Sequence, residues 1–286
     1  MELTNIGTVK EILSRHGFNF SKGLGQNFII NPTICPQIAE LGNAQKGWGI
    51  LEIGTGIGVL TKELALRADI VSAVEIDSRL IPVLNETLSE FDNINIYNED
   101  VMKADLYGII ERDFKDLHIA VCANLPYYIT SPVIMLLLES RLPIESITVM
   151  VQKEAAQRLC AKVGSRESGA ITVGVNYYGT VQHLLNVSRG NFIPSPNVDS
   201  AVIRIDVNNK RRLSEDAEKF FFKIVKAGFS QRRKTIANSL GSQLGINKEL
   251  IYNVLRSQGL SESSRIESLN MEQLTEFSVT LMELLK

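Results

Sequence analysis

The chain has 286 residues, with 30 Lys and Arg against 32 Asp and Glu, which gives a formal net charge of −2. This balance excludes a protein that is basic over its whole surface, but it leaves room for a local basic face. The longest wholly apolar run, residues 133–138, is far shorter than the roughly 18 residues of a membrane-spanning helix. No apolar signal-peptide core follows Met1. We therefore expect a cytoplasmic protein that has no membrane partner.

The cysteines and histidines offer no ligand pattern. The three cysteines are widely spaced and odd in number, so neither a disulfide framework nor a CxxC knuckle is expected. The three histidines form no HExxH pair or other pair at metal-ligand spacing. We predict no metal site and no Ser-His-Asp triad.

We expect the first 45 residues to form an N-terminal arm followed by a short helix. Residues 20–28 are polar and glycine-rich, and residues 32–41 have the pattern of an amphipathic helix.

Strand and helix patterns then alternate, and we assign residues 46–209 to one domain. Apolar runs predict buried strands, and helices of about ten residues come between them. The expected strands are residues 48–53, 70–74, 94–97, 118–123, 146–151 and 201–205, and the clearest helices are residues 58–67 and 80–88. Such alternation is typical of a doubly wound α/β sheet, so the predicted fold is Rossmann-like.

The last part of the chain has a different character. From Ser214 onward only helical patterns appear, and glycines interrupt them. Residues 210–286 hold 13 Lys and Arg against 9 Asp and Glu, net +4, which leaves 17 against 23, net −6, for the residues before them. We expect residues 210–286 to be a smaller, separate all-α domain.

A glycine-rich turn between a predicted strand and helix marks a cofactor site. Gly54 and Gly56 allow the backbone to approach a ligand closely, and the following helix offers free N–H groups. The dinucleotide fingerprint requires a third glycine at position 59, where this chain has valine. Together with Glu52 before the turn, the pattern favours S-adenosylmethionine.

Two acidic residues follow the next strands and extend this site. Glu75, 21 positions after Gly54, is placed to accept hydrogen bonds from both ribose hydroxyls. Asp100 could accept a hydrogen bond from the adenine amino group while Val101 packs on the ring. Because the carboxyl ends of parallel strands share one edge, these groups predict a single ligand crevice.

The segment Asn124-Leu125-Pro126-Tyr127 suits methylation of a planar exocyclic amine. The Asn124 side-chain oxygen and the Leu125 carbonyl could accept the two N–H bonds of the amine and turn its lone pair toward a methyl donor. Pro126 fixes the turn, and Tyr127 could stack on an extruded base. Catalysis would then depend on positioning and electrostatics, without a strong base.

These motifs resemble those of the rRNA adenine N6,N6-dimethyltransferases. The likeness includes residues 52–61 and 124–132, and it continues at residues 24–28, 192–201 and 229–236. The set is most similar to the small-subunit enzymes, which dimethylate two adjacent adenosines near the 3′ end of 16S rRNA. The resemblance implies that Asn27 and Ile29 close over the cofactor and that Asn124 serves both cofactor and target. The implied partner is 16S rRNA within a small-subunit precursor, and we expect a monomer.

A basic run in the helical region is the expected RNA contact. Between residues 219 and 234 there are six positive residues and no negative ones. Phosphate contacts of this kind do not depend on sequence and weaken with salt. The residues that we assign to RNA binding are Lys223, Lys226, Arg232, Arg233 and Lys234.

Other functions remain open at this point. The same chemistry could act on 23S rRNA, as in resistance enzymes, or on DNA or a glutamine side chain, although Leu125 disfavours the last two groups, in which proline is commoner. A binding protein that assists ribosome assembly without catalysis is the alternative from a different class.

Overall fold

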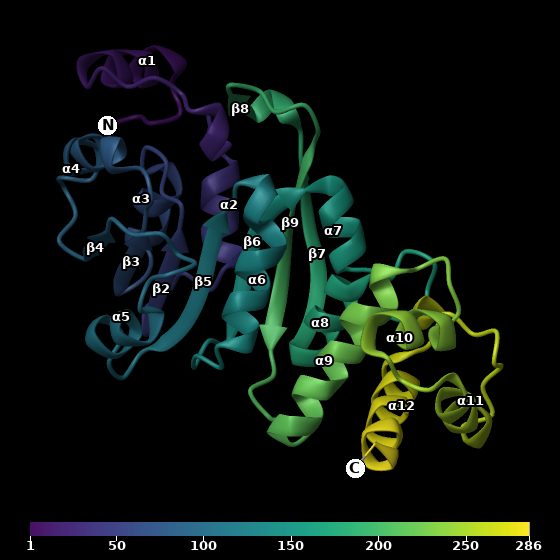
Figure 1. Ribbon diagram of the computed structural model, residues 1–286. Coiled ribbons are helices and arrows are strands. Elements are labelled where there is room, and N and C mark those ends of the chain that lie inside the picture. Colours follow the sequence, from purple (N-terminus) through teal and green to yellow (C-terminus); the bar gives the residue numbers. More distant parts are fainter. Residues whose placement is uncertain (286) are drawn as a thin grey trace. The chain divides into compact units, whose positions relative to one another are not determined.

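One sheet of seven strands organises the first part of the molecule (Figure 1). Its strands are β2 (Trp48–Ile53), β3 (Ile70–Val74), β4 (Ile94–Tyr97), β5 (His118–Asn124), β6 (Ser146–Gln152), β7 (Gly179–Val187) and β9 (Ser200–Val207). They lie in the order β4-β3-β2-β5-β6-β9-β7 in this computed structural model, which describes residues 1–285. The five strands β4, β3, β2, β5 and β6 run parallel to one another, and β9 pairs antiparallel with β6. The predicted Rossmann-like α/β fold is confirmed.

The register of the parallel strands brings their carboxyl ends to one edge. Ile53 of β2 is opposite Val74 of β3 on one side and Ala123 of β5 on the other. The chain continues from β2 outward to β3 and β4, and then returns to place β5 on the other side of β2. The order therefore reverses between β2 and β5, and a crevice for a ligand forms at such a switch point.

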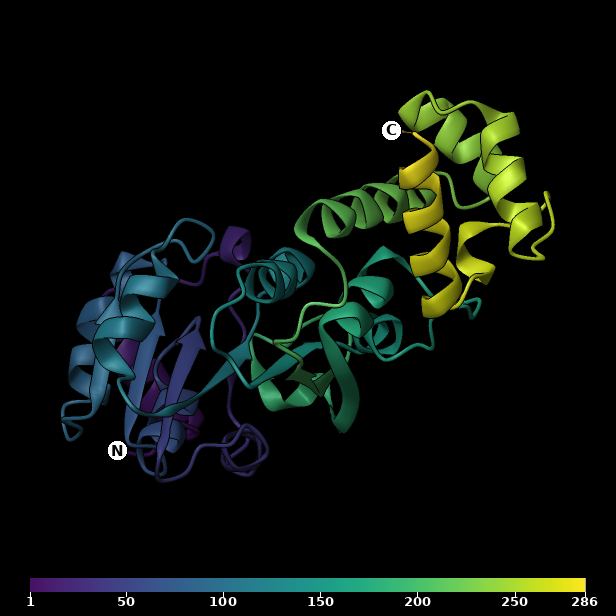
Figure 2. The same ribbon diagram turned by 90° about the horizontal axis from the view of Figure 1, so that it is seen from below.

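Helices cover both faces of the parallel strands (Figure 2). Side chains alternate between the two faces of β2, and Ile50 lies in a core that also contains Ile38, Leu64 and Leu84. A strand with helices on both faces is buried at successive positions, and β2 is buried from Gly49 to Ile53, with Glu52 as its one charged residue. The helices of this part are α1 (Ile6–Arg15), α2 (Ile34–Leu41), α3 (Val59–Ala65), α4 (Ile81–Thr87), α5 (Leu106–Asp113) and α6 (Thr130–Glu139), and α7 (Lys153–Leu159) follows β6.

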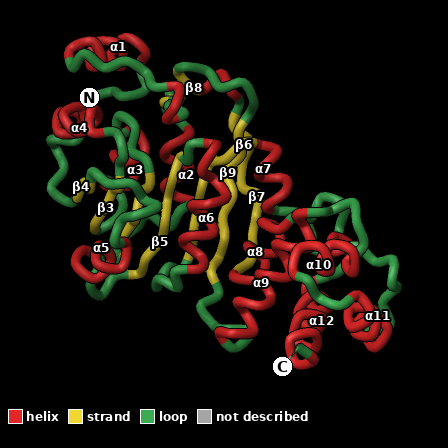
Figure 3. The backbone as a smooth tube through the Cα atoms, viewed as in Figure 1, coloured by secondary structure: helices red, strands yellow, loops and turns green. Residues whose placement is uncertain are grey.

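A second, two-stranded sheet connects the N-terminal arm to a distant segment. In it β1 (Phe28–Ile29) pairs antiparallel with β8 (Phe192–Ile193), as Figure 3 shows near the top of the view. The pairing continues because the Ile30 N–H donates to the Asn191 carbonyl at 2.9 Å. The arm is therefore an ordered part of the fold.

The chain divides into two compact units. The first unit contains Met1–Ala156 and Thr180–Asn208, and the second unit contains Gln157–Gly179 and Asn209–Lys286. The second unit is helical, with α8 (Ala170–Tyr178), α9 (Glu215–Ser230), α10 (Ile236–Leu244), α11 (Lys248–Ser257) and α12 (Met271–Leu284). The residue ranges of the two units differ from the expected 46–209 and 210–286, because residues 157–179 group with the C-terminal helices.

Aromatic packing explains why α8 belongs to the second unit. The ring of Tyr177 stacks on Phe221 with centroids 5.1 Å apart, and Tyr178 stacks on Phe222 at 5.4 Å. Aromatic pairs of this geometry contribute beyond the area that they bury. These contacts join α8 to α9, although about 40 residues separate them in the sequence.

Polar residues begin the helices of the second unit. Ser214, Thr235 and Asn247 each accept a hydrogen bond from a backbone N–H of the first turn of α9, α10 and α11. Asn270 and Gln273 bond reciprocally at the start of α12. Such caps satisfy N–H groups that have no partner within the helix. Within residues 1–285, no helix combines the length and apolar character that a membrane crossing requires.

Candidate active site

A cavity of about 260 Å³ opens at the carboxyl edge of the parallel strands in the first unit. It lies at the switch point between β2 and β5, where the fold favours a ligand. Its walls come from the arm, the glycine turn and the segments after β3, β4 and β5. The residues predicted for cofactor binding and catalysis all line it: Asn27, Ile29, Gly54, Gly56, Glu75, Asp100, Val101, Asn124, Leu125, Pro126 and Tyr127.

The glycine turn is shaped by left-handed backbone and by close approach of the arm. Gly54 and Gly56 have φ of 77° and 56°, a region that side chains with a Cβ rarely adopt. A Cβ at Gly56 would lie 3.1 Å from the Phe28 ring of the arm. The turn therefore needs glycine both for its conformation and for the contact that closes the cavity.

The Glu75 carboxylate lies in the cavity and contacts the glycine turn. Its Oε2 accepts hydrogen bonds from the Thr55 N–H at 3.0 Å, the Thr55 hydroxyl at 3.1 Å and the Gly56 N–H at 3.3 Å. Its Oε1 accepts one from the Asp77 N–H at 2.8 Å. Burial raises the pKa of Glu75 above its ordinary value, against the effect of these hydrogen bonds. Glu75 therefore also supports the turn, which the sequence did not indicate.

Apolar side chains surround the predicted adenine position. Val101 is buried, whereas Ile76 and Met102 line the cavity with 52% and 41% of their surface exposed. Asp100 accepts a hydrogen bond from the Met102 N–H at 3.0 Å, so part of its carboxylate holds the local turn. Sequence reasoning missed Ile76 and Met102, although each closely follows an acidic residue that it selected.

The predicted catalytic segment directly follows β5. Asn124 is beside the glycine turn, because its backbone neighbour Ala123 pairs with Ile53. The Asn124 Nδ2 donates to the Asn27 carbonyl of the arm at 3.4 Å. Its Oδ1 has no donor among the residues that the structure describes. This free acceptor lines the cavity.

The tyrosines after Pro126 differ in exposure. Tyr127 is half-buried and its hydroxyl lies 2.7 Å from the Ser200 hydroxyl at the start of β9. Burial raises the pKa of Tyr127, so the phenol stays neutral at ordinary pH. Tyr128 exposes 59% of its surface at the rim of the cavity. The segment thus presents one ring that a hydrogen bond holds, Tyr127, and one that is largely exposed, Tyr128.

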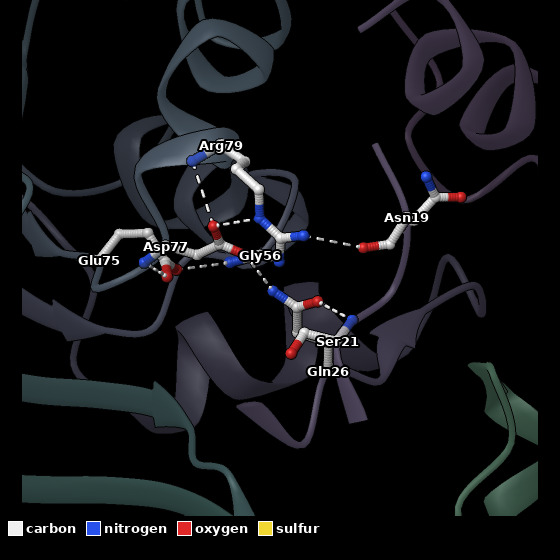
Figure 4. A network of polar contacts seen from close by, with 7 residues as sticks. All are labelled: Asn19, Ser21, Gln26, Gly56, Glu75, Asp77 and Arg79. Carbon is white, nitrogen blue, oxygen red and sulfur yellow. Dashed lines mark hydrogen bonds and ion pairs between the residues drawn. The ribbon is translucent and has the colours of Figure 1, made fainter. Parts of the chain in front are cut away.

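A polar network holds the arm to the segment after β3 (Figure 4). The Gln26 Nε2 donates to Asp77 Oδ2 at 2.7 Å, and its Oε1 accepts from the Ser21 N–H at 2.8 Å. Arg79 donates to Asp77 through Nε at 2.8 Å and Nη2 at 2.6 Å, and to the Asn19 carbonyl at 3.3 Å. Arg79 holds the pKa of the Asp77 carboxyl below its ordinary value. These residues were not selected from the sequence.

Glu52 is the least expected group of the cavity wall. Its side chain is fully buried, and neither carboxyl oxygen has a hydrogen-bond partner among the described residues. Burial raises the pKa of Glu52 to about 8. An unpartnered buried carboxyl that lines a cavity is characteristic of a ligand site rather than of a structural core. Within residues 1–285, no cluster of His, Cys, Asp and Glu is arranged for a metal ion.

The residues predicted to bind RNA belong to the second unit, whereas the residues of the cavity belong to the first. Lys223 and Lys226 are exposed on α9, three residues apart and therefore on one face. Arg232, Arg233 and Lys234 are exposed in the turn between α9 and α10. Arg232 is engaged, since its Nε donates to Glu267 at 2.7 Å and it also bonds the Arg166 carbonyl. The other four form no ion pair with any residue of the described chain.

Comparison with known proteins identifies relatives over the whole chain. The family model of ribosomal RNA adenine dimethylase matches residues 17–282. Ribosomal RNA small subunit methyltransferase A of Geobacillus thermodenitrificans is 44% identical over 289 residues, which cover 100% of this chain and 99% of that protein. The protein of the same name from Anoxybacillus flavithermus is 46% identical over 276 residues, with 95% and 94% covered.

Solved structures support the same assignment. A dimethyladenosine transferase from Plasmodium falciparum aligns with a TM-score of 0.72 and 26% identity, covering 87% of this chain and 95% of that one. The 23S rRNA methyltransferase ErmE aligns with a TM-score of 0.68 and 28% identity, covering 90% and 100%. On these matches, and on the fold and motifs described above, the chain belongs to the ribosomal RNA adenine dimethylase family.

Proposed function

We propose that this protein uses S-adenosylmethionine to dimethylate N6 of two adjacent adenosines near the 3′ end of 16S rRNA. The substrate would be a small-subunit precursor in the cytoplasm, and the protein would act as a monomer. The observation that carries the proposal is the free Asn124 Oδ1 in a cavity formed by the glycine turn, Glu75 and Asp100. The small-subunit methyltransferases that match along their full length support the choice of RNA.

The residues of the cavity fit a cationic nucleoside cofactor. Neither oxygen of the buried Glu52 carboxyl has a hydrogen-bond partner among the described residues, so a positive group in the cavity would supply a favourable interaction. The Glu75 carboxylate suits ribose hydroxyls, and its bonds from the Thr55 hydroxyl and the Gly56 N–H are the ones it would share or exchange. Ile76, Val101 and Met102 offer apolar contact to an adenine ring. When bound, S-adenosylmethionine supplies a methyl group that an amine can attack.

The catalytic segment would prepare the target amine. The Asn124 Oδ1 and the Leu125 carbonyl accept its N–H bonds, which directs the nitrogen lone pair away from the base ring. Tyr127 is held by Ser200 and presents its ring for stacking on the extruded adenine. Proton release needs no strong base, because the amine becomes acidic once it carries the additional methyl group. The protein therefore contributes positioning and electrostatic stabilisation.

The second unit would contribute affinity for RNA. Lys223, Lys226, Arg233 and Lys234 are exposed and free of ion pairs within the described chain, so they are available to phosphates. Such contacts orient a folded RNA without reading its sequence. Base selection then remains with the cavity of the first unit.

Two alternatives are distinguished by one experiment. The 23S rRNA methyltransferase ErmE has the same fold, and a catalytically silent assembly factor could use the same surfaces. The test incubates the protein with labelled S-adenosylmethionine and either unmethylated small subunits or 23S rRNA, followed by digestion and analysis of nucleosides. We expect N6,N6-dimethyladenosine from the small subunits only. Label in 23S rRNA alone, or in neither RNA, would overturn the proposal.

A further inference from the structure

The orientation of the Asn124 amide determines what it presents to a target amine. In the structure Nδ2 donates to the Asn27 carbonyl at 3.4 Å, which leaves Oδ1 facing the cavity as an acceptor. The opposite orientation would turn an N–H donor toward the N–H bonds of the amine, and two donors cannot bond to each other. The arm therefore selects the useful orientation through one backbone carbonyl.

Asn27 follows a residue that is fixed on two sides. The Gln26 side chain donates to Asp77 at 2.7 Å, which connects the arm to the segment after β3. It also accepts from the Ser21 N–H at 2.8 Å, which connects two parts of the arm. Asp77 is 6% exposed, and its other partners are the three donors of Arg79. As Figure 4 shows, Arg79 then reaches back to the Asn19 carbonyl on the arm.

The contacts around this network leave few other supports for Asn27. Among the described residues its own side chain donates only to the Gly25 carbonyl at 3.0 Å, within the same arm. On its C-terminal side, β1 fixes Phe28 and Ile29 by pairing with β8. On its N-terminal side, the fixed point is Gln26. The position of the Asn27 carbonyl is thus set between a strand pairing and the Gln26–Asp77 hydrogen bond.

We propose that Gln26, Asp77 and Arg79 act as positioning residues for methyl transfer: they hold the Asn27 carbonyl against Asn124 and so keep the catalytic amide oxygen directed at the target amine. This inference rests on the proposed function. The network touches no reacting atom, and its effect passes through Asn27. Methyl transfer tolerates only small displacements of the catalytic groups, well under about 1 Å. A loosened arm would therefore lower turnover even where the cofactor still binds.

The charges around Asp77 determine how a Gln26→Glu variant should depend on pH. Arg79 is the cation that faces it, Glu75 reaches its backbone N–H, and Gln26 is neutral. In a Gln26→Glu variant a second carboxylate would face Asp77 directly. The protonated acid at low pH could still donate to Asp77, whereas the ionised form at high pH would repel it.

The test compares four variants of the full chain with saturating cofactor and small subunits. We expect Gln26→Ala to lower kcat by about tenfold or more, with the KM for RNA and the Kd for S-adenosylmethionine changed less than about threefold. Gln26→Glu should lose turnover as pH rises from 6 to 8. Asp77→Asn, which removes the carboxylate oxygen that Gln26 and Arg79 share, should lower kcat in the same way as Gln26→Ala. Arg67→Gln, which breaks an ion pair with Glu63 away from the arm, is the control.

Hydrogen–deuterium exchange of the backbone amides of residues 19–30 provides a readout that does not need catalysis. Exchange there should rise in Gln26→Ala and in Asp77→Asn, and it should stay unchanged in Arg67→Gln. An unchanged kcat in Gln26→Ala or in Asp77→Asn, or an equal loss in Arg67→Gln, would overturn the inference. Absence of transfer to rRNA by the unmodified protein would overturn the proposed function instead, while the exchange measurement still reports whether Gln26 holds the arm.

Discussion

The two units carry opposite charge. The second unit, Gln157–Gly179 with Asn209–Lys286, holds 16 Lys and Arg against 10 Asp and Glu, net +6. The first unit holds the remaining 14 of 30 and 22 of 32, net −8. Dividing the sequence after residue 209 gave net charges of +4 for the C-terminal part and −6 for the rest. Grouping the residues by unit therefore increases the difference in net charge. A total of −2 therefore conceals one unit suited to a cationic cofactor and another suited to polyanions.

The two units also differ in how their key residues are fixed. In the first unit, parallel strands align Gly54, Glu75 and Asn124 at one edge, so function depends on the register of a buried sheet. In the second unit, exposed cations lie on a capped helix and the turn after it. Substitutions should therefore separate chemistry from RNA affinity, and stability of one unit from stability of the other.

The largest effect should come from Asn124→Ala. Loss of the amide acceptor should lower kcat by about 10²- to 10³-fold, as for other preorganised polar groups. Affinity for RNA, which we assign to the second unit, should change less than twofold, as measured by fluorescence anisotropy at fixed salt. Asn93→Ala, which removes bonds to the Ala65 and Ala68 carbonyls, is the matched control. A parallel loss of RNA affinity would contradict the division between the units.

Next in size is the pH dependence of stability caused by Glu52. Its pKa is about 8 in the folded protein against an ordinary value of 4.5, so between these values the folded state holds one more proton than the unfolded state. The contribution of Glu52 to the free energy of unfolding is therefore fully present below pH 4.5. It falls by roughly 1.4 kcal/mol per pH unit as the pH rises toward 8.

Glu52→Gln should remove this component of the slope. Urea unfolding at pH 5.5, 6.5 and 7.5 can be followed by the fluorescence of Trp48, the single tryptophan of the chain, which reports the first unit alone. Glu63→Gln, on α3, serves as the control. Identical slopes in the unmodified protein and in Glu52→Gln would show that the carboxyl does not titrate in this way.

Gly228→Ala should destabilise only the second unit. A Cβ at this position of α9 would lie 2.6 Å from Ile266 Cγ1, and overpacking of this kind costs about 1–3 kcal/mol. The midpoint from circular dichroism of the helices should fall, whereas the Trp48 midpoint should stay constant. Gly241→Ala, whose nearest atom belongs to the flexible Lys248 side chain, should be tolerated. A shift of both midpoints would mean that the units unfold together.

The smallest effect is expected from the basic surface. Arg233→Ala combined with Lys234→Ala should weaken RNA binding by about tenfold and reduce the slope of log affinity against log salt by about two. The kcat at saturating RNA should not change, because the cavity is untouched. Lys10→Ala combined with Lys115→Ala, which also removes two exposed positive charges but from the first unit, is the control. An unchanged salt slope would remove these residues from the RNA contact.

Much of the sheet could be predicted because a buried parallel strand leaves a simple pattern. The apolar runs at residues 48–53 and 118–123 correspond to β2 and β5. Strand β7 was missed because its middle residues, including Gln182 and His183, are polar and lie largely exposed. Helix α8 was missed because its valines and tyrosines favour a strand locally, and only packing on Phe221 and Phe222 makes it a helix of the second unit.

The candidate site shows the same limit. Gly54, Glu75, Asp100 and Asn124 follow strands, so the rule that ligands bind at carboxyl ends was enough to bring them together. Pairings between distant segments left no trace in the sequence. Gln26 and Asp77 are 51 positions apart, and the sequence gives no sign of their hydrogen bond. Likewise, Glu52 looks like an ordinary motif residue in the sequence, and only the structure shows that its buried oxygens lack a hydrogen-bond partner within the described part of the chain.

The path of the chain through the two units has a consequence for how the protein can be divided. The backbone crosses from one unit to the other after Ala156, after Gly179 and after Asn208. A single cut therefore cannot release either unit whole: a fragment that ends at residue 208 retains Tyr177 and Tyr178 without the phenylalanines on which they stack. Exchange of the helical unit between relatives, by recombination or by engineering, requires the 157–179 segment and the C-terminal helices to move as a matched pair.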